Sequence, residues 1–212
     1  MVKLVDFEKI ECPFVRVEID GAYIVTNKVA EGYEWVFEDP SVICVEKLHG
    51  TCCAVVIEHG VVTALFNRTN RIPFIGGPMS KRFVQGVNNA VDKGRIIMQD
   101  GIHWGELIGP GIQKNEYKLL ENEWVPFDWL RDPKHNTTYK SWGKYPKTFD
   151  AISEWFKTLM PLYSLREHGK EVMTTGFCEG VVFTHKDGRM AKLRRDMYPW
   201  FEGKRHKEQE EK

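Results

Sequence analysis

The sequence predicts an α+β fold, and three observations support that prediction: short β-branched runs, tight turns between some of them, and two helical patterns. The β-branched runs predict strands at residues 14–19, 42–46, 53–57 and 61–66. Antiparallel strands can be joined by tight turns, whereas consecutive parallel strands need a long crossover, usually a helix. The sequence therefore favours antiparallel sheets with separate helices over a parallel α/β sheet.

Two hairpins are predicted from their turns. The third and fourth runs are separated by residues 58–60, whose sequence Glu-His-Gly has the length of a hairpin turn. A second hairpin is predicted from residues 177–185 and 189–193, which flank Lys-Asp-Gly at 186–188. Asp-Gly is a strong short-range turn signal, because both residues tolerate the backbone angles that a tight turn requires.

Two helices are predicted from apolar residues at helical spacing. Ser80 can cap the first helix and Asp150 the second, because either side chain can accept a hydrogen bond from an exposed helical N–H. The apolar faces are formed by Phe83, Val84, Val87, Ala90 and Val91 in the first helix and by Ile152, Trp155, Phe156 and Leu159 in the second. The second pattern is interrupted near Pro161. We interpret both helices as packing elements.

The composition is that of an ordinary globular protein, with 212 residues, 42% of them hydrophobic, and a formal net charge of zero. Because no linker or repeat divides the sequence, we expect one domain over residues 1–201, followed by a charged tail at 202–212.

Five cysteines without a CxxC pair argue against a disulfide framework and a zinc knuckle. With no apolar run long enough to span a membrane, we expect a soluble monomer without a membrane partner, located in the cytoplasm or, for a viral protein, in the host cytoplasm.

The zero net charge hides an uneven distribution. Residues 1–46 carry a net charge of −6, whereas residues 47–109 and 186–212 each carry +3. The field at a surface depends on nearby charges more than on the total, so a polyanionic partner is not excluded. Candidate residues for a phosphate-backbone surface are Lys81, Arg82, Lys93, Arg95, Lys186, Arg189, Lys192, Arg194 and Arg195.

The most informative segment is Glu-Lys-Leu-His-Gly-Thr at residues 46–51. It places Lys47 at the end of an apolar strand, where partial burial and neighbouring cations would favour the neutral, nucleophilic amine. Gly50 lets the backbone approach a ligand closely, and Thr51 offers a hydroxyl group. By itself this segment is also an ordinary surface feature, so its interpretation depends on the motifs that follow it.

Further motifs follow in a fixed order. They are Asn67-Arg68-Thr69, residues 104–113 (WGELIGPGIQ), Pro126-Phe127-Asp128, residues 178–183 (CEGVVF) and Ala191-Lys192-Leu193-Arg194. Together these segments resemble the collinear motifs of the covalent nucleotidyltransferases, which include DNA ligases, RNA ligases and mRNA capping enzymes. The resemblance spans residues 47–194. KLHGT, GELIGPGIQKN and EGVVF are most similar to the ATP-dependent RNA ligases of the second phage T4 type, which seal nicks in duplex RNA.

The resemblance implies a nucleotidyltransferase fold with two antiparallel sheets flanked by helices, so the domain at residues 1–201 is expected to be an adenylyltransferase domain. It also implies a reaction in three steps. Lys47 attacks the α-phosphorus of ATP and expels pyrophosphate, AMP moves to a 5′-phosphate end, and a 3′-hydroxyl attacks that end and releases AMP. Positioning and charge neutralisation dominate such displacements at phosphorus. ATP and Mg²⁺ or Mn²⁺ are the implied cofactors.

The resemblance assigns roles to the catalytic residues. Lys47 is implied to be the nucleophile, and Lys192 and Arg194 are implied to hold the α-phosphate oxygens. Glu179 is implied to bind the divalent metal, directly or through water, because Mg²⁺ and Mn²⁺ prefer oxygen ligands. The last motif commonly reads Lys-x-Lys, so Arg194 departs from it: an arginine can bind phosphate but cannot give up its proton.

A second group of residues is implied to bind the nucleotide. Glu106 would accept a hydrogen bond from the ribose, Phe127 would stack on the adenine, and Arg68 would contact phosphate. The same resemblance adds Glu46, His49, Gly50 and Thr51 to the nucleotide pocket. Taken singly, each of these residues has a structural interpretation, such as a surface ion pair or a core aromatic, and it is their joint order that favours the functional one.

The expected partner is RNA, as a nicked duplex or as single-stranded ends, with DNA and hybrid substrates left open and a separate end-healing enzyme as a further partner. Only 18 residues follow Arg194, where related enzymes have a C-terminal domain, so we expect a bare adenylyltransferase domain, either a minimal ligase or a truncated chain. Two alternatives remain. A capping guanylyltransferase would use GTP with the same lysine chemistry, and an inactive nucleotide- or RNA-binding module would form no covalent AMP.

Overall fold

The computed structural model describes residues 4, 6–96, 98–135, 137–139, 145–163 and 178–205. The chain divides into two compact units. Unit 1 comprises Met1–Lys9 and Leu48–His135, and unit 2 comprises Ile10–Lys47 and Asn136–Lys212. The single adenylyltransferase domain over residues 1–201 stays a prediction, and most of the predicted tail, residues 206–212, lies outside the described residues.

Unit 2 contains a two-stranded and a three-stranded sheet in its described part, both antiparallel. The first is the hairpin of β1 (Phe14–Ile19) and β2 (Ala22–Val29). The second has the order β10-β9-β3, formed by β3 (Ile43–Lys47), β9 (Gly180–Thr184) and β10 (Met190–Arg194). Its described helical elements include α1 (Trp35–Glu38), α4 (Phe149–Lys157) and the 3₁₀ turn η4 (Arg195–Met197). The central position of β9 brings the residues of β3 and β10 into one sheet.

One face of the three-stranded sheet forms the core of unit 2. Because side chains alternate along a strand, Cys44, Val181 and Leu193 share this face, where they join a cluster with Ile152 and Phe156 of α4. Each of these side chains is 0–1% exposed, and burial of apolar surface is the dominant favourable term in folding. The opposite face of the sheet is therefore the one that can carry polar residues.

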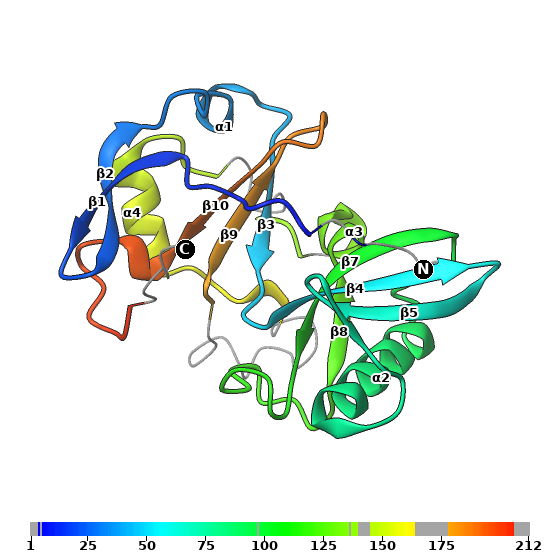
Figure 1. Ribbon diagram of the computed structural model, residues 1–212. Helices are drawn as coiled ribbons and strands as arrows, with labels where there is room; N and C mark the ends of the chain where they lie inside the picture. The colour runs from blue at the N-terminus through cyan, green and yellow to red at the C-terminus, as the bar shows by residue number, and fades with distance from the viewer. Residues whose placement is uncertain are drawn as a thin grey trace. The chain divides into compact units, whose positions relative to one another are not determined.

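Unit 1 contains a five-stranded antiparallel sheet with the order β6-β5-β4-β7-β8. Its strands are β4 (Thr51–Glu58), β5 (Val61–Asn67), β6 (Asn70–Ile72), β7 (Gly101–Ile108) and β8 (Glu123–Pro126). The helical elements are α2 (Gly77–Asp92), α3 (Phe127–Arg131) and the 3₁₀ turn η1 (Pro133–His135). Figure 1 shows α2 lying along one face of this sheet.

The two faces of the five-stranded sheet are covered differently. On one face, Phe83 and Val87 of α2 pack against a cluster that includes Cys53 and Leu107. On the other face, Leu4 packs against alternate residues of β4 and β5, namely Ala54, Val56, Ala64 and Phe66. The N-terminal segment of the chain therefore lies on the face opposite α2.

The predicted α+β class and its antiparallel pairing are confirmed, but the described residues form three sheets rather than the two that the resemblance implied. The strands predicted from β-branched runs correspond to β1, β3, β4 and β5. The first predicted hairpin turn is confirmed, because His59 and Gly60 both have positive φ, at 53° and 70°. In the second hairpin, residue 177 lies outside the described residues, and Gly188 in the turn has a φ of 96°.

Both predicted helix caps are wrong. Helix α2 begins at Gly77 with Pro78 in its first turn, so Ser80 is buried inside the helix rather than at its N-terminus. Proline favours a helix start at this point rather than at Ser80, because N–H groups in the first turn have no partner within the helix and proline lacks that group. Helix α4 is capped by Thr148, whose hydroxyl accepts from the N–H of Ala151, so Asp150 lies within its first turn.

In the described part of the chain, no helix combines the length and the apolar character that a membrane span needs.

Candidate active site

Unit 2 brings Lys47 and Glu179 into direct contact. Lys47 is the last residue of β3, and Glu179 immediately precedes β9, its partner strand. The Lys47 ammonium donates a hydrogen bond from Nζ to Glu179 Oε2 over 2.7 Å, with the two side chains 23% and 16% exposed. This pair is accessible to a ligand but largely shielded from bulk water, so its charges are screened less than those of an exposed pair.

The register of the three-stranded sheet places the predicted phosphate-binding cations on the same face as Lys47. Gly180 belongs to the central strand, β9. It pairs with Lys47 of β3 along one edge of that strand and with Arg194 of β10 along the other. Lys192, two residues before Arg194, shares its face because side chains alternate. A Cβ atom at Gly180 would meet the Leu193 carbonyl oxygen at 2.1 Å. Glycine is thus required between the lysine and the arginine, and it leaves that part of the face without a side chain.

Arg194 has an acidic partner within unit 2. Its Nε donates to Asp196 Oδ1 over 2.8 Å, and its Nη2 lies 3.5 Å from Asp196 Oδ2. The two side chains are 10% and 15% exposed. Asp196 thereby fixes the direction of the guanidinium group, which retains further N–H donors for a ligand because arginine carries five.

Glu46 lies on the other face of the sheet, away from Lys47. It is 1% exposed, its Oε2 accepts from the backbone N–H of Tyr163 over 2.6 Å, and its Oε1 has no hydrogen-bond partner among the described residues. Burial raises the pKa of Glu46 to about 8, partly offset by backbone hydrogen bonds from Tyr163 and Leu162. Glu46 is thus a buried residue on the face opposite Lys47, where its hydrogen bond with Tyr163 anchors the strand that carries Lys47.

Unit 1 carries the residues that follow the lysine. The His49 N–H donates to the Tyr117 hydroxyl over 2.7 Å, and the Gly50 carbonyl accepts from Gln113 Nε2 over 3.0 Å. A Cβ atom at Gly50 would lie 2.3 Å from the Leu107 carbonyl oxygen, so only glycine fits this approach of two backbone segments. Thr51 then begins β4 opposite Leu107 of β7. The GPGIQKN segment therefore holds the turn after the lysine.

Glu106 and Phe127 lie on or beside the sheet face that is opposite α2. Cys52 is directly opposite Glu106, and Ala54 is directly opposite Trp104, so these four side chains share one face. Phe127, the first residue of α3, follows the end of β8. Its ring centroid lies 5.2 Å from that of Phe7, whose ring also lies 5.3 Å from Trp104. The predicted ribose and adenine contacts thus belong to one aromatic-rich surface.

Arg68 occupies the turn between β5 and β6 and has a φ of 52°. Its N–H donates to the Cys52 carbonyl over 3.3 Å, which fixes the turn near the start of β4. Its guanidinium donates from Nε and Nη2 to Asp6 Oδ2 over 2.9 and 2.6 Å. The predicted phosphate contact is thus positioned by the backbone and paired with a carboxylate of the N-terminal segment.

The predicted residues therefore fall into two sets. Unit 2 places Lys47, Lys192 and Arg194 on one sheet face, with Glu179 in contact with Lys47 and Glu46 on the opposite face. Unit 1 holds His49, Gly50, Thr51, Arg68, Glu106 and Phe127. Among the described residues, no cluster of three or more histidine, cysteine or acidic side chains could hold a metal. A lone carboxylate such as Glu179 still fits Mg²⁺, which is commonly bound by one or two carboxylates together with substrate phosphates and water.

Two members of the predicted basic surface are buried, Arg194 at 8% exposed and Arg95. Arg95 is 5% exposed, and its guanidinium pairs with the carboxylate of Glu123, which Lys93 also contacts. The Arg95 guanidinium further lies over the ring of Trp129, 5.1 Å from its centroid. A buried arginine with these partners is a structural residue, so the prediction that Arg95 contacts a phosphate backbone is wrong.

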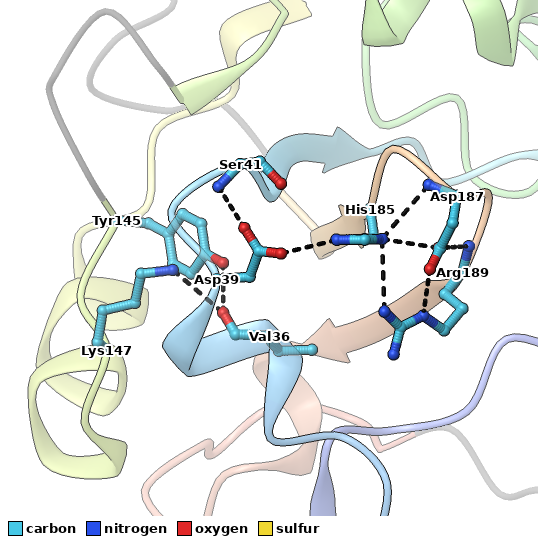
Figure 2. Close-up of polar contacts among 8 residues, drawn as sticks. All are labelled: Val36, Asp39, Ser41, Tyr145, Lys147, His185, Asp187 and Arg189. Carbon is cyan, nitrogen blue, oxygen red and sulfur yellow. Dashed lines mark hydrogen bonds and ion pairs between the residues drawn. The ribbon is translucent and has the colours of Figure 1, made fainter.

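Sequence reasoning missed a polar cluster at the tip of the β9–β10 hairpin, which Figure 2 shows around His185. His185 Nε2 lies 2.8 Å from Asp39 Oδ2, and its Nδ1 lies 2.8 Å from Asp187 Oδ1. Hydrogen bonds with Asp187 and then Asp39 raise the pKa of His185. Asp187 also accepts from Arg189, and the Asp187-Gly188 turn was the signal that could have located this cluster.

Comparison with known proteins gives a family match and a set of similar solved structures. The family model described as RNA ligase matches residues 40–201 of this chain. Similar solved structures of the Naegleria gruberi RNA ligase include a variant with ATP and Mn (13% identity, TM-score 0.49), an apo variant (12%, 0.48) and the ligase with PPi (17%, 0.43). They cover 87%, 87% and 76% of this chain and 59%, 59% and 51% of the Naegleria chains, so this chain spans less than two thirds of their length. No curated protein matches the sequence.

Proposed function

The chain belongs to the RNA ligase family, and from this premise we propose that it is an ATP-dependent RNA ligase that works through a covalent lysyl-AMP intermediate. In the first step, Lys47 Nζ forms a bond to the α-phosphorus of ATP, and the bond from that phosphorus to pyrophosphate breaks. In the second, a 5′-phosphate oxygen displaces Lys47 and takes the AMP. In the third, a 3′-hydroxyl attacks the activated 5′-phosphate, forms the phosphodiester and releases AMP.

The observation that carries this proposal is the position of Lys47 on the three-stranded sheet. Its Nζ contacts Glu179 over 2.7 Å, and the register puts Lys192 and Arg194 on the same sheet face. Nearby positive charges favour the neutral amine that the attack needs, whereas Glu179 favours the ammonium. Lys47 must therefore give up the hydrogen bond to Glu179, and a proton, before it can attack.

Arg194 and Lys192 are proposed to hold the phosphate oxygens during this displacement. Arg194 is kept in one direction by Asp196, and such preorganised charge is effective because it needs no reorganisation during the reaction. Mg²⁺ or Mn²⁺, held by Glu179 and the phosphates of ATP, would neutralise charge on the phosphates. Glu179 is suited to this role because its side chain is partly exposed and its carboxylate already binds a cation, the Lys47 ammonium.

The residues of unit 1 are proposed to recognise the nucleotide and the phosphate. Glu106 would accept from a ribose hydroxyl, Phe127 would offer its ring to the adenine, and Arg68 would bind phosphate through its guanidinium edge. His49, Gly50 and Thr51 would line the nucleotide pocket through the turn that Gln113 holds. These roles follow the family resemblance residue by residue, and each can be tested by substituting the residue.

The proposal is tested by incubating the protein with α-labelled ATP and Mg²⁺ or Mn²⁺, followed by denaturing electrophoresis. We expect covalent label from ATP and none from α-labelled GTP. Label from GTP alone would support the capping alternative, and no label from either nucleotide would support a binding module. A sealing assay on 5′-phosphorylated nicks in RNA, DNA and hybrid duplexes then identifies the substrate, for which we propose nicked duplex RNA.

A further inference from the structure

Two consecutive residues of the N-terminal segment contact two of the proposed ligand-binding residues of unit 1. Asp6 accepts both hydrogen bonds from Arg68, and the ring of Phe7 packs beside that of Phe127. Leu4 attaches the segment to the face of the five-stranded sheet that is opposite α2. Leu4 is 7% exposed and packs on β4 and β5. A carboxylate and an aromatic ring thus lie where a phosphate and a base are proposed to bind.

Asp6 occupies the part of Arg68 that is best suited to phosphate. Nε and Nη2 form the edge of a guanidinium group that presents two parallel N–H bonds to a carboxylate or a phosphate. Asp6 meets this edge with a single oxygen, Oδ2, because its Oδ1 accepts from the N–H of Phe7 over 2.8 Å. A phosphate group could present one oxygen to each N–H and would match the same edge better.

The contact between Asp6 and Arg68 is also weak enough to be displaced. The Arg68 and Asp6 side chains are 56% and 36% exposed, and ion pairs with this exposure contribute little in water. Because Asp6 is held on the same unit, however, it competes with a ligand at a high effective concentration. The competition lowers the apparent phosphate affinity by a small, measurable factor.

On the basis of the proposed phosphate-binding role of Arg68, we infer that Asp6 competes with phosphate for Arg68 and so lowers the phosphate affinity of this site. Its carboxylate occupies the Nε–Nη2 edge of Arg68 until a phosphate group of a substrate displaces it. The phosphate can belong to ATP or to the 5′ end of an RNA strand, because both present the same oxygens to the guanidinium group. Two binding measurements distinguish these sources.

The test compares Asp6→Asn with a matched control in the full chain. Asparagine keeps the oxygen that accepts from Phe7 but loses the negative charge. The control is Asp132→Asn, since Asp132 is 34% exposed, accepts from a nearby backbone N–H and pairs with Lys134 over 2.7 Å. One arm measures the ATP concentration that gives half-maximal covalent labelling. The other measures the Kd for a nicked RNA duplex with a 5′-phosphate, relative to the same duplex with a 5′-hydroxyl.

We expect Asp6→Asn to tighten binding about twofold to fivefold in one or both arms, while Asp132→Asn changes neither. The gain should disappear when Asp6→Asn is combined with Arg68→Ala, because the effect acts through Arg68. An equal gain in the control, a gain that persists with Arg68→Ala, or weaker binding with Asp6→Asn would overturn the inference. The inference would also be overturned if Arg68→Ala changed neither measurement. Lysine labelling would persist in that case, so the proposed function would stand. Loss of labelling in the wild type would instead refute the proposed function.

Discussion

Lys47 Nζ and Glu179 Oε2 lie 2.7 Å apart although 132 residues separate them in the chain. The pairing of β3 with β9 creates this contact, because Lys47 is opposite Gly180 and Glu179 is the preceding residue. The contact joins the proposed nucleophile to the proposed metal ligand. It also requires that the carboxylate release the lysine during the reaction, which makes Glu179 the residue whose substitution is most informative.

We predict that Glu179→Gln slows covalent labelling of the protein by ATP about 10- to 100-fold. Glutamine preserves the shape of the side chain but binds a divalent cation poorly, because it lacks the charge. The measurement is the initial rate of labelling at several Mg²⁺ concentrations. Glu154→Gln is the matched control, since Glu154 is an exposed carboxylate of α4 that pairs with Lys157. Equal rates in both variants would remove Glu179 from the mechanism.

The buried carboxyl group of Glu46 should make stability depend on pH. Because burial raises its pKa from 4.5 to about 8, the folded state keeps this proton over a range in which the unfolded state loses it. The unfolding free energy therefore falls as pH rises from about 4.5 to 8, by at most about 1.4 kcal/mol per pH unit from this group.

Glu46→Gln should remove this dependence, because glutamine is always neutral and still accepts from the N–H of Tyr163. Urea unfolding at pH 5 and pH 8 measures the effect. We expect the variant to gain stability relative to the wild type as pH rises, whereas Glu46→Ala should be destabilised at both pH values by the loss of the acceptor. A pH-independent difference between wild type and Glu46→Gln would show that Glu46 is ionised in the folded protein.

His185 should stabilise the protein mainly in mildly acidic solution. Its pKa is raised by hydrogen bonds with Asp187 and Asp39, so its contribution is complete below the unfolded pKa of about 6.5 and is lost as pH rises through the higher folded value. The pKa of Asp187 is lowered to about 2, chiefly by the N–H of Arg189, so that side of the pair persists until strongly acidic pH.

Thermal unfolding of the wild type and His185→Gln tests this window. We expect the variant to have a lower Tm than the wild type at pH 5 and a smaller difference at pH 9. Asp39→Asn should reproduce the trend, because it removes one of the two carboxylates around the imidazole. A difference that is the same at both pH values would indicate packing rather than charge as the role of His185.

Cys52 is predicted to be the most reactive thiol of the five cysteines, all of which the structure describes. It is half-buried, whereas the others are buried, and burial raises the pKa of each buried thiol, for Cys12 to about 11. Because Cys52 is opposite Glu106 on the proposed nucleotide-binding face, ATP should slow its alkylation. Mass spectrometry after limited N-ethylmaleimide treatment, with ATP or without nucleotide, measures this. If Cys44 or Cys53 were modified before Cys52, that order would contradict the greater accessibility of Cys52.

Local sequence signals identified much of the fold. The β-branched run at residues 14–19 coincides with β1, and the run at 61–66 lies within β5. Strand β7 was missed because Gly101, Gly105 and Glu106 interrupt the alternation of β-branched residues. The helix caps were wrong because Ser80 and Asp150 look like caps locally, while Pro78 and Thr148 begin the helices earlier.

The candidate site depended on a different kind of information. No spacing rule predicts that Lys47 meets Glu179 or that His185 meets Asp39, 146 residues away, because these contacts depend on strand pairing. The family resemblance supplied the first pair through its ordered motifs. It supplied neither the His185 cluster nor the contact between Asp6 and Arg68, which involve residues outside those motifs.

The central claim is that Lys47 becomes covalently attached to AMP, and peptide mapping by mass spectrometry tests it most directly. After incubation with ATP and Mg²⁺, we expect the AMP adduct on Lys47 and its absence from Lys47→Ala, while Lys134→Ala, which removes an exposed lysine, is labelled like the wild type. An adduct on another residue, or equal labelling of Lys47→Ala and the wild type, would contradict the account.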